Sequence, residues 1–178
     1  MYGMVNEAIR SMVIETFDIE FWDEVCTELD LEFKTFKSFE QYDDKVTGDL
    51  VGVISKRADL EPVKLLEEFG KYWIKYAQES EYSSILETFS TSPLELLKSL
   101  DNLHTRLQLT FDDLDAPSFS VTEISDNEIN VHYSSERELP LEFFVIGLIH
   151  GIFDMFNQSC QVEIIPALNG EKGVFKVI

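Results

Sequence analysis

His104 lies on the apolar face of an expected helix. Leucines at positions 96, 97, 100, 103 and 107 recur at helical spacing after Ser92-Pro93, and His104 shares their stripe. Taken alone, this position favours a core histidine that is hydrogen-bonded to backbone. The alternative is an axial ligand of haem iron, because a neutral imidazole is a good donor to iron and a wall of leucines provides a dry pocket.

A second candidate cluster follows at the end of an expected strand. Tyr133, Ser135 and Arg137 alternate with other residues and extend the odd-numbered face of Ile129 and Val131, which we expect to face the core. A phenol, a hydroxyl and a guanidinium spaced about 6.6 Å apart are costly to bury unpaired. They could grip a carboxylate ligand, or be satisfied by internal Asp or Glu residues. The cluster alone supports both interpretations equally.

Together, the two features favour a cofactor. A histidine on a leucine-rich helix and an inward row of anion donors are what a haem with two propionates requires. The sequence carries no Gly-rich phosphate loop and no HExxH or GxSxG motif. We therefore predict no catalytic activity for this chain.

The first two-thirds of the chain is predicted to be helical. Asp43 or Asp44 is a candidate cap for a helix that begins near residue 44. Pro62 fits the first turn of another helix. That helix carries Gly70 in its middle, and an interior glycine often marks a close approach or a bend. The segment that begins at Ser92-Pro93 is a further helix.

The last third is predicted to be mixed. From residue 118 the period changes to two, in SFSVTEIS and EINVHYSSER, which Asp126-Asn127 join as a turn. The apolar helix LEFFVIGLIHGIFDMF and two strands around Asn169-Gly170 follow. The expected fold is α+β, one domain over 1–178, with a helical subdomain over 1–60 and a mixed subdomain with a small antiparallel sheet over 61–178.

Charge and composition exclude several classes of partner. The 178 residues carry 14 Lys and Arg against 34 Asp and Glu, a net charge of −20, which disfavours nucleic acids and anionic membrane surfaces. No signal peptide or apolar run of membrane-spanning length is present. The two cysteines, Cys26 and Cys160, are far apart and indicate free thiols in a reducing cytoplasm.

Over essentially its whole length the chain resembles the H-NOX family, the haem-nitric oxide/oxygen binding domains related to the sensor domain of soluble guanylate cyclase. The resemblance lies in MYGMVNEAI, FGKYW, LDNLH, PSF and YSSER, in that order. It implies haem b buried between the two subdomains, with His104 as the iron ligand. It also implies that Tyr133, Ser135 and Arg137 clamp the propionates and that Pro117 presses on the porphyrin.

The resemblance also bears on the choice of gas. Family members that hold dioxygen carry a tyrosine donor in the helix after the clamp, where this chain has Phe144, and no tyrosine occurs after Tyr133. Trp73 resembles a distal tryptophan that could donate to a bound gas, and it is equally well interpreted as core. Val5 and Leu148 match apolar positions of the same wall and are also equally well interpreted as core.

These implications lead to one expected function. We expect a cytoplasmic haem sensor of nitric oxide and carbon monoxide, in which nitric oxide weakens the iron–His104 bond and the helix relaxes. The chain ends without an output domain, so a separate partner is expected, such as a histidine kinase or a cyclic-di-GMP enzyme. Reversible dioxygen binding with Trp73 as donor and a haem-free interaction module remain as alternatives.

Overall fold

The residues that the structure describes form seven helices and four strands. In this computed structural model the described residues are 1–178 except 81–82, 90, 110–113, 138 and 168–170. The helices are α1 (Gly3–Thr16), α2 (Ile19–Glu28), α3 (Asp44–Ala58), α4 (Pro62–Glu79), α5 (Ser83–Phe89), α6 (Pro93–Gln108) and α7 (Glu142–Met155). The strands are β1 (Ser118–Ser125), β2 (Glu128–Ser134), β3 (Val162–Ile165) and β4 (Gly173–Val177).

Polar caps and prolines set several helix starts. Asp18 accepts from the backbone N–H of Phe21, and Ser92 accepts from that of Glu95, which satisfies donors that a helix leaves free in its first turn. Asp43 is the cap of α3, so Asp44 is released for another contact. Prolines occupy the first positions of α4 and α6, where their missing N–H costs nothing.

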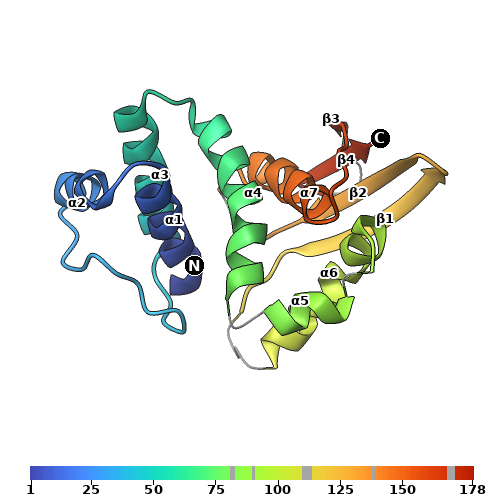
Figure 1. The fold of residues 1–178 in the computed structure, drawn as a ribbon, viewed down its shortest axis with the longest axis horizontal. Helices are drawn as coiled ribbons and strands as arrows, with labels where there is room; N and C mark the ends of the chain where they lie inside the picture. Colours follow the sequence, from blue (N-terminus) through green and yellow to red (C-terminus); the bar gives the residue numbers. More distant parts are fainter. Residues whose placement is uncertain (81–82, 90, 110–113, 138, 168–170) are drawn as a thin grey trace.

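Two hydrophobic cores form on either side of α4. One collects side chains of α1, α2, α3 and the first half of α4 around the fully buried Trp22. The other collects α6, α7 and the sheet around Phe175 and Ile149. Trp73 and Phe144 pack against both cores. Figure 1 shows α4 standing between the helices α1–α3 and the rest of the molecule.

The sheet is antiparallel, in the order β1-β2-β4-β3. Phe119 of β1 pairs with Tyr133 of β2, and Val131 pairs with Val121 on one side and Phe175 on the other. Val131 and Tyr133 are both buried, which confirms that the odd-numbered face of β2 lies inward. The prediction that Ser135 and Arg137 continue this strand face is wrong, because β2 ends at Ser134 and the Ser135 hydroxyl then accepts the backbone N–H of Arg137.

Helices α4 and α7 meet at backbone contact. A Cβ added to Gly147 would lie 1.8 Å from the carbonyl oxygen of Glu67, and one added to Gly70 would lie 2.1 Å from that of Phe144. Only glycine allows helices to approach this closely. The crossing brings Phe69 and Trp73 of α4 against Phe144 of α7.

The predicted α+β fold is confirmed, with one element missed. Helix α5 was not among the expected helices. The turn predicted at Asn169-Gly170 lies outside the described residues. Within the described part of the chain, none of the helices is long and apolar enough to cross a membrane.

Candidate functional site

A cavity between α1, α4, α6, α7 and the end of β2 brings together all nine side chains that the sequence singled out. Its lining includes Val5, Trp73, His104, Pro117, Tyr133, Ser135, Arg137, Phe144 and Leu148. Most of the remaining lining is aliphatic or aromatic, with Thr47 of α3 and Asp115, a contact of Arg137, as polar exceptions. An apolar pocket with a few convergent polar groups is the usual form of a cofactor site.

His104 is oriented by the chain segment that follows its helix. Its Nδ1 lies 2.8 Å from the carbonyl oxygen of Pro117, so Nδ1 carries the proton and donates it. Burial lowers the pKa of His104, although the Pro117 carbonyl and the charge of Asp101 oppose this shift. The imidazole is therefore neutral at pH 7. Among the described residues Nε2 has no hydrogen-bond partner, which leaves its lone pair available to a metal.

A second hydrogen bond fastens the same segment to α6. The backbone N–H of Phe119 donates to Oδ1 of Asp101 at 2.5 Å, three residues before His104 on the helix. The ring of Phe119 lies 5.9 Å from that of His104 and 5.4 Å from that of Tyr133, centroid to centroid. Helix α6 and the start of β1 are thus coupled at two points.

Tyr133 and Ser135 bring hydroxyl groups to the cavity. Tyr133 is buried at 3% exposure, while Ser135 is half-buried. Burial raises the pKa of Tyr133, and a hydrogen bond with Ser135 offsets part of that effect. The Ser135 hydroxyl also accepts the backbone N–H of Arg137. Tyr133 therefore stays protonated and able to donate.

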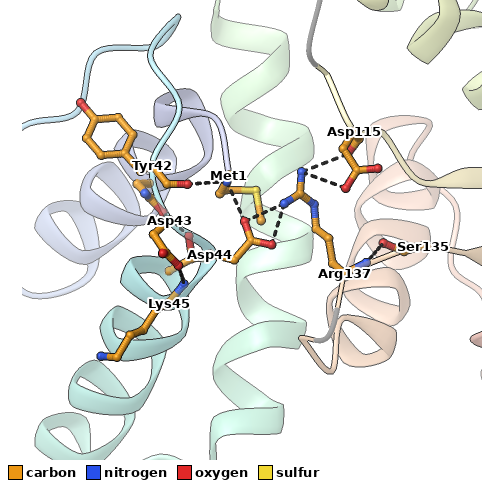
Figure 2. A network of polar contacts seen from close by, with 10 residues as sticks. Met1, Tyr42, Asp43, Asp44, Lys45, Asp115, Ser135 and Arg137 are labelled. Atoms are coloured by element: carbon orange, nitrogen blue, oxygen red, sulfur yellow. Dashed lines mark hydrogen bonds and ion pairs between the residues drawn. The ribbon is translucent and has the colours of Figure 1, made fainter.

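Arg137 is paired with two acids of the chain itself. Its Nη1 donates to both carboxylate oxygens of Asp44, at 2.6 and 2.7 Å. Its Nη2 donates to the backbone carbonyl of Asp115 at 3.1 Å and lies 3.5 Å from its carboxylate. Figure 2 shows the two acids on opposite sides of the guanidinium. Internal acids were the alternative that the sequence left open for this cluster.

Asp44 also contacts the first residue. The α-ammonium group of Met1 donates to Asp44 Oδ1 at 2.6 Å and to the carbonyl oxygen of Tyr42, also at 2.6 Å. Burial on its own raises the pKa of Asp44, but the hydrogen bonds from Met1 and Arg137 outweigh it and lower the pKa. The carboxylate is thus ionised and joins α3 to the end of β2.

Sequence reasoning missed both acidic partners of Arg137. Asp44 is 93 residues from Arg137 along the chain and Asp115 is 22, so no local pattern connects them. Asp44 was considered only as a helix cap. The chain has 34 acidic residues, and no sequence motif around Asp44 or Asp115 marks either one as a partner of Arg137.

The wall across the cavity is almost entirely apolar. The ring of Phe144 lies 5.3 Å from that of Phe69 and 6.5 Å from that of Trp73, while Val5 and Leu148 complete the wall. The indole N–H of Trp73 has no hydrogen-bond partner among the described residues. It is therefore the one side-chain N–H on the described part of this wall that could serve a small ligand without breaking an existing bond.

The other histidines and the cysteines lie outside the cavity lining. His132 contacts Thr122 and Glu171 on the outer face of the sheet, and His150 Nδ1 lies 3.7 Å from Cys160 Sγ. Both cysteines are free thiols. Across the described residues there is no cluster of three or more His, Cys, Asp or Glu side chains that could hold a metal ion.

Comparisons with known proteins agree on one family. A family model described as Haem-NO-binding matches residues 2–164. Soluble guanylate cyclase 89Da of Drosophila melanogaster is 26% identical over 173 residues, which are 97% of this chain and 26% of that protein. Guanylate cyclase soluble subunit beta-2 of Rattus norvegicus is 33% identical over 102 residues, 57% of this chain and 15% of that protein. The chain thus spans about a quarter or less of the length of these relatives.

Solved structures show the same fold. The Fe(II) unliganded H-NOX protein from K. algicida matches with a TM-score of 0.82 at 23% identity, covering 99% of this chain and 95% of that one. The H-NOX protein from S. oneidensis in the Fe(II)NO ligation state matches with a TM-score of 0.88 at 16% identity, covering 100% and 98%.

Proposed function

The chain belongs to the haem-NO-binding (H-NOX) family, whose cofactor is haem, and from this premise we propose that it is a ferrous-haem sensor of nitric oxide and carbon monoxide. The observation that carries the proposal is His104, whose proton is fixed on Nδ1 by Pro117 and whose free Nε2 belongs to a partly buried, neutral imidazole. Bound haem supplies a ferrous iron with an open coordination position for a small gas.

The residues of the cavity fit a haem. A flat apolar group with two carboxylates needs an imidazole on one face, an apolar wall on the other and anion donors at one edge. His104 provides the first, Phe144 and Leu148 contribute to the second, and the hydroxyl groups of Tyr133 and Ser135 lie at the edge with Arg137. We assign the roles of iron ligand to His104, porphyrin contact to Pro117 and propionate clamp to the other three.

The apolar wall formed by Val5, Phe144, Leu148 and Trp73, here called the distal wall, favours nitric oxide and carbon monoxide over dioxygen. Bound dioxygen carries partial negative charge and benefits from a hydrogen-bond donor, which Phe144 cannot supply. The indole N–H of Trp73 supports a second candidate function, reversible dioxygen binding, because Trp73 lines the cavity and its N–H has no hydrogen-bond partner among the described residues.

The signal leaves the cavity through α6. A changed restraint on His104 Nε2 shifts the imidazole, and the hydrogen bonds to Pro117 and from Phe119 to Asp101 pass that shift to β1. A gas acts in this way only if its affinity differs between the two arrangements. We propose that a partner protein reads this change, with a histidine kinase or a cyclic-di-GMP enzyme as the candidates, in the cytoplasm and without catalysis by this domain.

The test is haem retention by a matched pair of histidine variants. His104→Ala removes the imidazole from the cavity, whereas His132→Ala removes one from the outer face of the sheet. We expect His132→Ala to match the wild type in haem content and ferrous spectrum. We expect His104→Ala to lose most haem, and added imidazole to restore a ferrous spectrum. A His104→Ala protein with the wild-type spectrum would refute the assignment.

A further inference from the structure

Only one of the two acids that contact the Arg137 guanidinium lines the cavity. Asp115 lines the cavity together with Tyr133, Ser135 and Arg137, whereas Asp44 is not part of the lining. Nη2 therefore contacts the acid that lines the cavity, while Asp44 holds Nη1 on the other side of the guanidinium (Figure 2).

Asp44 and Asp115 already neutralise the positive charge of the Arg137 guanidinium. Arg137 is mostly buried, with 13% of its side chain exposed, and both carboxylates bear on one guanidinium. A third carboxylate that approaches Nη2 meets the carboxylate of Asp115 and finds that donor engaged by the Asp115 backbone carbonyl. Occupation of the clamp therefore requires one internal acid to leave.

Asp115 is the acid that can leave. Asp44 receives two short hydrogen bonds from Nη1, whereas the Asp115 carboxylate lies 3.5 Å from Nη2. The side chain of Asp115 is 52% exposed, against 35% for Asp44, so it can return to water at little cost.

We propose that Asp115 is an internal competitor for the carboxylate of the ligand at Arg137, and that a haem propionate displaces it. The inference rests on the proposed function, because it takes haem as the ligand of the cavity. Asp115 thereby lowers the affinity of the site for carboxylate-bearing porphyrins, while Asp44 keeps Arg137 in place before and after the exchange.

The test compares Asp115→Asn with a control of equal charge. Asp115→Asn keeps the shape and the backbone contact but removes the competing charge. Asp126→Asn makes the same change of net charge in the exposed β1–β2 turn. The partition of haem between each protein and serum albumin gives the relative affinities, and haem dimethyl ester, which has no free carboxylate, serves as the second probe.

The expected result is specific to one variant and one probe. Asp115→Asn binds haem about two- to fivefold more tightly than the wild type, the range that exposed charge pairs support. Asp126→Asn stays at the wild-type value, and the gain of Asp115→Asn disappears with the dimethyl ester. Asp115→Ala also raises the affinity for haem, which shows that the effect does not come from the introduced Asn amide.

Other outcomes overturn the inference. If Asp115→Asn binds haem no more tightly than Asp126→Asn does, local competition by Asp115 is excluded. If Asp115→Asn gains equal affinity for the dimethyl ester, the haem carboxylate is excluded as the competing group. Either result leaves the proposed function intact as long as haem binding still depends on His104. A wild-type protein that binds no haem refutes the proposed function and the competition with it.

Discussion

Replacement of Gly147 by Ala tests the close crossing of α4 and α7 on which the distal wall depends. The added Cβ would lie 1.8 Å from the Glu67 carbonyl oxygen and 3.0 Å from the Cα of Gly70. These are backbone atoms, so no rotation of a flexible side chain relieves the clash. The helices must separate by more than an ångström at the point where Phe144 meets Phe69 and Trp73.

The expected cost follows from the size of this overlap. Overpacking in a tight core costs about 1–3 kcal/mol and occasionally more. Because the obstacle is another helix backbone, we expect Gly147→Ala to lower the free energy of unfolding by about 3 kcal/mol. The matched control is Gly52→Ala in α3, where a Cβ meets nothing within 4 Å. There alanine removes the glycine penalty, and we expect a gain of roughly 0.5–1 kcal/mol.

Urea denaturation of both haem-free variants, followed by far-UV circular dichroism, measures the two changes. The slope with denaturant should stay constant if only stability changes. A Gly147→Ala protein as stable as the wild type would show that the helices can separate freely, and the reasoning about the crossing would be wrong. A destabilised Gly52→Ala protein would contradict the propensity argument instead.

Three further predictions concern the cavity and the acids that support its residues. Asp101→Ala leaves the buried N–H of Phe119 without its acceptor, so it should lower the free energy of unfolding by about 1–3 kcal/mol. It also removes a nearby negative charge, so the pKa of His104 should fall further, which NMR titration of the haem-free protein would detect. The pKa of Asp44 in the folded protein lies below its usual value of 3.8. The ionised carboxylate therefore stabilises the fold above pH 3.8, and this contribution is lost as the pH falls through the folded-state pKa. The difference in unfolding free energy between the wild type and Asp44→Asn should vanish in strong acid. Trp73→Phe should leave the nitric oxide spectrum unchanged, whereas a stable oxy complex present in the wild type and lost in this variant would establish the dioxygen function.

Local signals were sufficient to predict most elements. The helix starts at Pro62 and at Ser92-Pro93 were predicted correctly, and Asp43 was one of two candidate caps for α3, because these signals act within one helical turn. The inward face of β2 was also predicted, since alternation along a strand is a local property that the buried Val131 and Tyr133 confirm.

The contacts of Arg137 could not be predicted from local signals. The residue types indicated a need for an anionic partner, but β2 ends at Ser134, so the predicted strand alternation does not place Ser135 and Arg137. The choice of Asp44 and Asp115 depends on how α3 and the 114–117 segment approach the chain after β2. The same limit applies to the α4–α7 crossing. Gly70 was recognised as a point of close approach or bending, but its partner Gly147 was identified only by the fold.

The central claim is that His104 and the clamp hold a ferrous haem that responds to nitric oxide. An anaerobic absorption spectrum of the purified, reduced protein, exposed separately to nitric oxide and to air, tests it most directly. The account predicts a five-coordinate ferrous haem that shifts sharply with nitric oxide and forms no stable oxy complex. Absence of a haem band after addition of haem, or a ferrous spectrum that nitric oxide leaves unchanged, would contradict it.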